Sequence, residues 1–195
     1  MKDAIRISSP ADILGFIPRS LGFVPRESFV FLTMRGKTLG ATLRVDAPPF
    51  AEPASFARYM VIDYLALDTQ ATAVLLAIYT ASTPALGQSR PFHDHGEAVI
   101  QALETARTPL QDAWLVTPSH WQNLLCDSDA VCCPPEALES ITDGQLNAEL
   151  VFRGRRYQKT PAPPTRRSQA PQTEKNRSGR HCPARGAAFG PGTVG

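Results

Sequence analysis

The chain has 195 residues, of which 43% are hydrophobic, and a formal net charge of +2. This length allows one domain with a short appendage. Four cysteines are too few for a secreted disulfide scaffold, and the start of the chain has no apolar run of the kind found in signal peptides. No apolar stretch approaches the ~20 residues that span a bilayer. The composition therefore predicts a cytoplasmic protein with no membrane partner.

Charge is distributed unevenly along the chain. Residues 1–157 carry 13 basic and 17 acidic side chains, whereas residues 158–195 carry 7 basic side chains and 1 acidic one. The second part also contains 6 prolines and 5 glycines. It cannot bury enough surface to offset the entropy of ordering, which predicts a disordered basic tail over residues 158–195. Such a tail contacts phosphates nonspecifically, so no specific nucleic-acid partner is expected.

The first predicted element is a helix that begins near Ser9. Ser9 can cap this helix, Pro10 suits its first turn, and Asp12 favours the positive end of the helix dipole. Apolar residues then recur at helical spacing. Pro18 interrupts this pattern and predicts a short or bent helix, and Gly22 is placed to stop it.

Two β-rich segments follow, residues 29–34 and residues 38–45. The short turn between them contains a glycine, which predicts a hairpin. One apolar stripe from residue 53 to about residue 67 predicts a second helix. The continuous apolar run over residues 73–79 is typical of a strand that is buried on both faces.

The remaining elements are shorter. We predict a third helix from residue 97 to about residue 107 and a strand over residues 113–116. Residues 121–125 are its possible hairpin partner. Residues 136–141 predict a helical turn, and residues 146–152 predict a last helix.

The order of these elements defines the fold class. Strands that alternate with helices between Thr38 and Val116 need crossover connections, which favour parallel strands, whereas the flanking hairpins make the sheet mixed. We therefore predict a single α/β domain over residues 5–154, with a mixed sheet of about five strands and helices packed on its faces.

Three segments together resemble a known family. They are residues 7–14 with the sequence Ser-Pro-Ala-Asp, residues 21–30 leading to Arg44-Val45-Asp46, and residues 126–135 with the pair Cys-Cys followed by proline. In this order and spacing they are similar to the mainly actinobacterial family called domain of unknown function 4192. The resemblance implies no substrate, cofactor or catalytic residue.

Members of that family continue with a helical portion rich in alanine and leucine. This chain turns instead, at about residue 154, into the tail rich in proline, arginine and glycine. Such a mixture is typical of a GC-rich genome read out of frame. We therefore expect a truncation or a frameshift after about residue 154, which the underlying DNA would test.

Three of the four cysteines, Cys126, Cys132 and Cys133, fall within eight residues. With His120 as a fourth ligand they are candidates for a zinc site. Adjacent cysteines point in divergent directions in an extended chain, which weakens this hypothesis. A disulfide across the short loop is a second interpretation. A loop of partly buried, structural cysteines is the favoured one.

Two other pairs are candidate ligand contacts. His93 and His95 lie near the start of a predicted helix, after a buried strand, where α/β proteins often place their sites. The alternative is a solvated loop in which Asp94 favours the helix N-terminus. Arg44 and Asp46 share one strand face and could bind an anion, although an ion pair that locks the hairpin is favoured.

Two common catalytic signatures are missing from the chain. It has no glycine loop with a lysine for phosphate binding and no Gly-x-Ser-x-Gly motif. We therefore favour a non-catalytic binding or regulatory module that uses the cysteine loop and the loop face near residues 80–95. The alternative is a metal-assisted hydrolase-like enzyme that uses the cysteine loop and the nearby histidines.

Overall fold

The structure, a computed structural model, describes residues 7, 9–48, 52–82, 90–126, 133–142, 148, 149, 152, 154, 157 and 158. All of them lie in the first of the two compact units into which the chain divides, Met1–Ala162. Apart from Gln158, the predicted tail lies outside the described residues, as does most of the predicted helix over residues 146–152. No helix within these ranges is long and apolar enough to cross a membrane.

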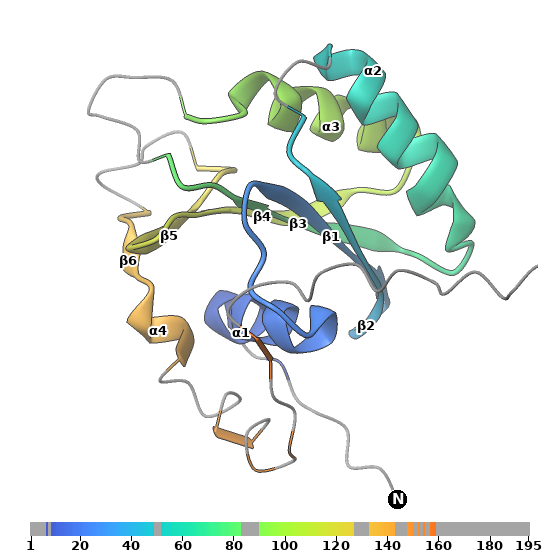
Figure 1. Ribbon diagram of the computed structural model, residues 1–195. Helices are drawn as coiled ribbons and strands as arrows, with labels where there is room; N and C mark the ends of the chain where they lie inside the picture. The colour runs from blue at the N-terminus through green and yellow to red at the C-terminus, as the bar shows by residue number, and fades with distance from the viewer. Residues whose placement is uncertain are drawn as a thin grey trace, which may run out of the picture. The chain divides into compact units, whose positions relative to one another are not determined.

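The described residues form an α/β fold with a six-stranded sheet (Figure 1). In chain order the elements are α1 (Pro10–Leu21), β1 (Ser28–Arg35), β2 (Thr38–Asp46), α2 (Pro53–Arg58), the π-helical turn η1 (Tyr59–Tyr64), the 3₁₀ turn η2 (Leu65–Leu67), β3 (Ala73–Tyr79), α3 (His93–Thr105), β4 (Leu110–Val116), β5 (His120–Asn123), β6 (Glu136–Ala137) and α4 (Glu139–Thr142). The predicted mixed sheet with helices on its faces is confirmed.

The strands lie in the order β2-β1-β3-β4-β5-β6. Among the strands of the described residues, β3 and β4 pair in parallel, and the pairs β1–β2, β1–β3, β4–β5 and β5–β6 are antiparallel. Since β1 reverses direction between β2 and β3, β2, β3 and β4 run the same way. The crossover connections therefore join strands of one direction, as predicted, and the first connection passes over β1.

The local signals around α1 are confirmed in detail. The Ser9 hydroxyl accepts a hydrogen bond from the Asp12 N–H at 3.2 Å, and the Asp12 carboxylate accepts one from the Ser9 N–H at 3.1 Å. Gly22 ends the helix with a left-handed φ of 84°. Pro18 does not end the helix, which continues to Leu21.

Helices lie on both faces of the sheet (Figure 1). Because successive side chains of a strand point to opposite faces, the buried side chains form two apolar layers, one on each face. Phe29, Leu76 and Leu115 face α2, η1 and α3. On the opposite face, Leu75 and Trp114 belong to the layer that includes α1 and the segment around α4. Because both faces are covered, every residue of β3 is buried, as its apolar run predicts.

The helix predicted from residue 53 to residue 67 begins at Pro53 and ends at Leu67, but its hydrogen bonding is not uniform. Its middle, η1, has π-helical hydrogen bonding, and its last turn, η2, is a 3₁₀ turn. Glu52 caps its start, since its carboxylate accepts hydrogen bonds from the N–H groups of Ala54 and Ser55. π-Helical turns are rare and recur at functional sites.

Candidate ligand-binding site

A cavity of about 540 Å³ lies at the carboxyl ends of β3 and β4, the edge at which open α/β sheets bind ligands. These strands and the residues after them contribute Tyr79, Thr80, Ala81, Val116, Thr117 and Pro118. The rest of the lining comes from α1, the segment before β1, the segment around α4 and one later residue: Leu14, Pro18, Val24, Pro25, Arg26, Glu27, Leu138, Ile141, Thr142 and Tyr157. We call this the strand-end cavity.

A second cavity, of about 550 Å³, borders the amino ends of the same strands. Asp112 is the carboxylate in its lining, and burial raises the pKa of that group despite hydrogen bonds from the Ala113 N–H and the Asn123 amide. The amino ends of parallel strands are not the usual ligand edge of α/β sheets. The strand-end cavity is therefore the candidate site.

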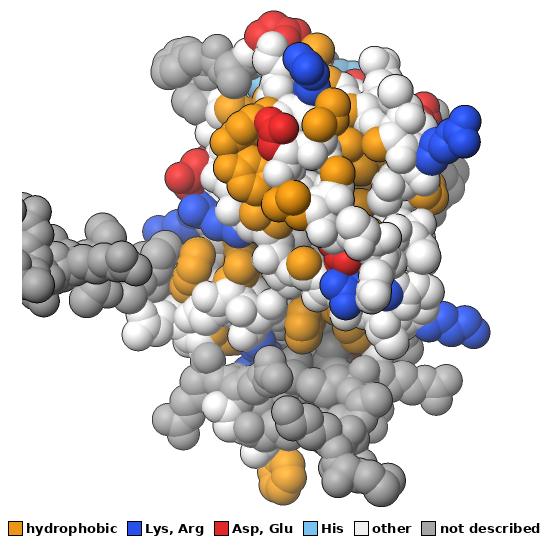
Figure 2. Space-filling model, turned by 90° about the vertical axis from the view of Figure 1, so that its right-hand side faces the viewer, with side chains coloured by type: hydrophobic (Ala, Val, Ile, Leu, Met, Phe, Trp, Pro, Cys, Tyr) orange, Lys and Arg blue, Asp and Glu red, His pale blue; other side chains and the backbone are white. Residues whose placement is uncertain are grey.

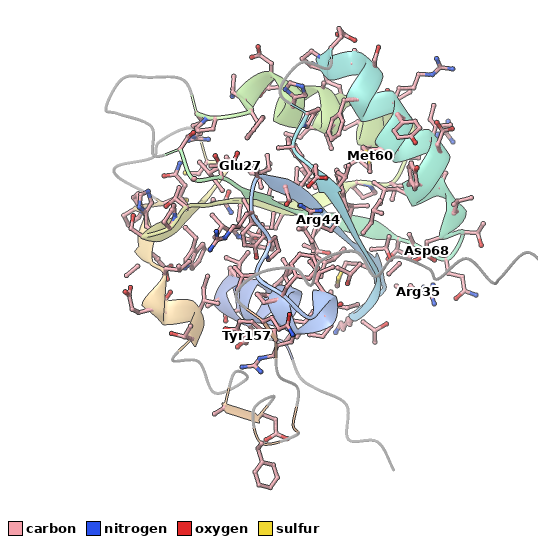
Figure 3. The ribbon with its side chains drawn as sticks, viewed as in Figure 1. Glu27, Arg35, Arg44, Met60, Asp68 and Tyr157 are labelled. Carbon is pink, nitrogen blue, oxygen red and sulfur yellow. The ribbon has the colours of Figure 1, made fainter. Side chains whose placement is uncertain are left out.

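Glu27 is the carboxylate in the lining of the strand-end cavity, and its backbone is in the left-handed region with a φ of 39°. Residues other than glycine adopt this conformation at a cost, and such residues cluster at functional sites. The carboxylate accepts hydrogen bonds from the Ala81 N–H and from the Thr80 hydroxyl, the latter at 3.3 Å. These contacts fix Glu27 at the end of β3, where Figure 3 labels it beside the start of β1.

The other hydroxyls in the lining belong to Tyr79, Thr117, Thr142 and Tyr157. Burial, followed by the nearby Tyr157, raises the pKa of Tyr79, so its phenol stays neutral at physiological pH. Thr117 donates a hydrogen bond to the His120 carbonyl at 2.8 Å and accepts one from the His120 N–H at 3.1 Å. Most of the remaining surface is apolar. The cavity thus combines an apolar body with a few fixed polar groups, as small-molecule sites do.

Arg26 is the cation in this lining, and it lies next to Glu27. Its side chain is exposed. No ion pair joins its guanidinium to another described residue, whereas the Glu27 carboxylate is anchored by backbone. The negative charge of Glu27 is therefore held in place by hydrogen bonds, whereas the guanidinium of Arg26 has no ion-pair partner among the described residues.

Tyr157 reaches the cavity from far along the chain. Gln158 forms a parallel bridge with Phe23: its N–H donates to the Gly22 carbonyl at 2.8 Å, and its carbonyl accepts from the Val24 N–H at 3.0 Å. Figure 3 labels Tyr157 beside α1. The central carbon of the Arg19 guanidinium lies 5.1 Å from the centroid of the Tyr157 ring, over its face. We call this pair of residues, Tyr157 and Gln158, the strap.

The two predicted pairs of ligand contacts lie outside the cavity lining. Arg44 pairs with Asp46 and donates to the Ser28 hydroxyl at 3.0 Å, with its guanidinium 5.9 Å from the Phe23 ring centroid. These bonds tie β2 to the start of β1. Anion binding by Arg44 and Asp46 stays a prediction.

His93 and His95 belong to the first turn of α3, which starts four residues earlier than predicted. On a helix, residues two apart point in different directions. His93 is exposed, whereas the ring of His95 lies 5.7 Å from Phe56 and 6.1 Å from Phe92, centroid to centroid. The two imidazoles therefore do not form a pair on one face.

Of the predicted zinc ligands, Cys132 lies outside the described residues. His120 is in β5, with its Nδ1 3.0 Å from the Ser119 hydroxyl. Cys126 and Cys133 are half-buried. Among the residues that the structure describes, no three His, Cys, Asp or Glu side chains gather as a metal site would require. The zinc hypothesis, which includes Cys132, stays a prediction.

The loop that holds Cys126 is nevertheless close to the start of α3. The guanidinium of Arg90 donates to the Leu124 carbonyl at 3.2 Å and to the Cys126 carbonyl at 3.0 Å. The segment before α3 and the start of the cysteine loop are thus joined, although they are far apart in the sequence.

Sequence reasoning did not single out Glu27, Tyr79 or Tyr157 as site residues. Two signals were available. Tyr79 ends an otherwise aliphatic strand with a polar group, and Tyr157 is the last aromatic residue before the composition of the chain changes. The left-handed φ of Glu27 has no sequence signal, because this conformation is typical of glycine or asparagine.

The fold and the site define an α/β domain with a ligand-sized cavity at the carboxyl ends of its parallel strands. The chain belongs to the family described as Domain of unknown function (DUF4192), whose model matches residues 10–187. This match continues beyond residue 154 and includes most of the basic tail. No curated protein and no solved structure matches the chain.

Proposed function

We propose that the protein is a binding module that holds a small, largely apolar molecule in the strand-end cavity. The observation that carries this proposal is the cavity itself, since about 540 Å³ is within the usual range for small-molecule sites. Its position at the carboxyl ends of β3 and β4 agrees with the general rule for ligand sites in open α/β sheets.

The polar groups suggest what the ligand carries. Oε1 of Glu27 accepts the Ala81 N–H, whereas the only hydrogen bond of Oε2 within the described part of the chain is a long one, 3.4 Å, from the Thr80 hydroxyl. Oε2 therefore has acceptor capacity left for a ligand. A molecule with an apolar body and a hydrogen-bond donor at one end, such as an amine, fits this arrangement.

The experiment uses the full chain and the uncharged dye N-phenyl-1-naphthylamine, whose fluorescence rises in apolar sites. Ala81→Trp places a large ring at the cavity lining, and the matched control Ala106→Trp adds the same ring at the exposed end of α3. We expect Ala81→Trp to remove most of the dye signal and Ala106→Trp to leave it unchanged. Equal signals in both variants would contradict binding in the cavity.

A second candidate function is a metal-assisted hydrolase-like enzyme built from the cysteine loop, His120, His93 and His95. The hydrogen bonds of Arg90 favour it, because they hold the start of that loop near the start of α3. Elemental analysis of the purified chain tests it. Stoichiometric zinc that is lost in Cys126→Ser would support this function, whereas a chain that binds no zinc and is as stable after Cys126→Ser would remove its basis.

Both functions are proposed for a reducing, cytoplasmic setting. Four cysteines in 195 residues suit intracellular thiols better than a disulfide scaffold. Labelling of the thiols in the native chain with a maleimide, before and after reduction, would check this setting, since cytoplasmic thiols react without reduction.

A further inference from the structure

Large apolar side chains are exposed along the outer side of η1 and η2. Tyr59, Ile62, Tyr64 and Leu67 are 51%, 55%, 40% and 76% exposed, although Met60 beside them is buried. They are four of the six large hydrophobic residues that are exposed among the described ones. Figure 2, which faces the side of the molecule that carries these turns, shows hydrophobic side chains mixed with acidic and basic ones. Such a grouping marks an interaction surface.

The two tyrosines of this surface hold each other in place. Their hydroxyls are 2.7 Å apart, and their rings meet edge to face with centroids separated by 5.0 Å. The π-helical turn makes this possible, because it brings residues five apart to about the same side of the helix. Fixed side chains lose less entropy when a partner binds, so the surface is prepared for a contact.

Two opposite charges flank the apolar residues, Arg58 at the end of α2 and Asp63 in η1. Arg58 precedes Tyr59, and Asp63 follows Ile62; both side chains are exposed. In the described part of the chain neither forms an ion pair. The pKa of the Tyr59 phenol is raised, first by the hydrogen bond with Tyr64, then by the charge of Tyr64 and by burial. The charge of Asp63 adds the smallest contribution to this rise. Asp63 therefore lies close to the apolar surface.

We propose that this surface, residues 58–67, binds the same surface of a second copy of the chain across a two-fold axis. In this arrangement the two identical helical segments pack antiparallel, and the axis passes level with the midpoint between Met60 and Val61. A residue that lies before this midpoint in one copy then faces the residue that lies equally far after it in the other. Tyr59 then meets Ile62 of the second copy, and Arg58 meets its Asp63. By symmetry each pair occurs twice, as an isologous interface requires.

The charges are what select a second copy over another occupant. A segment with arginine before its apolar centre and an acid after it is complementary to itself only in the antiparallel arrangement. Leu67, the most exposed of the large apolar residues on this surface, then lies level with Ala54 of the second copy, which is small and exposed.

The oligomeric state of the full chain tests this proposal by sedimentation equilibrium over a range of concentrations. We expect a monomer–dimer equilibrium. Ile62→Glu and Arg58→Asp should each weaken dimerisation on the order of tenfold or more, through a buried charge and through like-charge repulsion. The control Leu125→Glu changes an exposed leucine elsewhere, after β5, and should leave the equilibrium unchanged.

Charge reversal gives the sharper result. Arg58→Asp alone and Asp63→Arg alone should each fail to pair with themselves, whereas an equimolar mixture of the two variants should form a heterodimer with both ion pairs restored. A monomer at every concentration, a dimer indifferent to Arg58→Asp, or a mixture that stays monomeric would each overturn the proposal. Far-ultraviolet circular dichroism of each variant shows that it is folded, so loss of pairing is not loss of structure.

Discussion

The carboxylate of Glu27 accepts a hydrogen bond from the backbone N–H of Ala81, 54 residues further along the chain. This contact joins the start of β1 to the end of β3 beside the strand-end cavity. The left-handed backbone conformation of Glu27, together with this hydrogen bond, sets the direction in which its side chain points. The negative charge of the cavity is thus held in one position.

The first prediction concerns the head group that this charge selects. Hexylamine should bind the protein more tightly than hexanoate, because hydrogen bonds hold the Glu27 carboxylate at the cavity whereas the neighbouring Arg26 is exposed to solvent. Glu27→Gln keeps an acceptor for the Ala81 N–H but removes the charge, so it should abolish the preference with little change in folding. Competition of each probe against N-phenyl-1-naphthylamine measures the two affinities. A preference for hexanoate in the wild-type chain would contradict the assignment of Glu27.

The second prediction concerns Gly40 in β2. The β1–β2 ladder shifts register between Leu32 and Met34, and Thr33 uses its hydroxyl instead: it donates to Asp68 at 2.6 Å and accepts from the Ala41 N–H at 2.8 Å. A Cβ at Gly40 would meet this hydroxyl closer than van der Waals contact allows. Gly40→Ala should therefore lower the free energy of unfolding by about 1–3 kcal/mol.

Urea unfolding measures this loss, and a double-mutant cycle provides the control. In a Thr33→Ala background the clashing hydroxyl is gone, so Gly40→Ala should cost markedly less. Equal costs in the two backgrounds would mean that the close approach to Thr33 is not the cause.

The parts of the fold that the sequence predicted depend on neighbouring residues. The capping interactions of Ser9 and Asp12 and the left-handed Gly22 act within a few residues, and the apolar run of β3 reports burial directly. The hairpin of β1 and β2 has a short turn that leaves little choice of pairing. For these elements local chemistry and the final structure agree.

The parts that the sequence did not predict depend on distant residues. The position of β1 between β2 and β3 depends on packing between segments that are distant in the chain, so no single segment predicts it. The bridge between Gln158 and Phe23 joins residues 135 positions apart in the chain. The lining of the cavity comes from segments that are far apart in the chain. The sequence indicated the residues after β3 as a binding face, but it did not predict most of the other lining residues.

The third prediction concerns acid sensitivity at Asp68. The Thr33 hydroxyl, followed by the Arg35 guanidinium at 2.9 Å, holds the pKa of this carboxyl below its usual value (Figure 3). A lowered folded-state pKa means that Asp68 stabilises the fold above its unfolded pKa of about 3.9 and loses that contribution as the pH falls through the folded value. Asp68→Asn should flatten the dependence of Tm on pH below about pH 4.

Thermal melts between pH 2 and pH 6 measure this slope. Glu104→Gln changes an exposed carboxylate on α3 and serves as the control, whose slope should match that of the wild-type chain. An Asp68→Asn variant with the wild-type slope would show that the acid-sensitive groups lie elsewhere.

The fourth prediction compares two buried tryptophans on the same face of the sheet. The indole N–H of Trp121 donates to the Ser140 hydroxyl at 3.0 Å, whereas the buried indole N–H of Trp114 has no hydrogen-bond partner among the described residues. Each change to phenylalanine removes similar volume, but only one removes a hydrogen bond. Trp121→Phe should therefore cost about 1 kcal/mol more than Trp114→Phe in urea unfolding. The reverse order would mean that Trp114 has a partner beyond the described residues.

The fifth prediction concerns access to the strand-end cavity past the strap. Tyr157 lines the cavity, and in the part of the chain that the structure describes the strap is attached by two backbone hydrogen bonds of Gln158 and by the contact of the Tyr157 ring with Arg19. Removing the ring should open the cavity without unfolding the domain, since contacts of this kind contribute about 0.5–2 kcal/mol. Tyr157→Ala should raise both the association and the dissociation rates of N-phenyl-1-naphthylamine in stopped-flow measurements. Tyr157→Phe keeps the ring over Arg19 and should behave as the wild-type chain does, so equal rates in all three chains would rule out the strap as a barrier to entry.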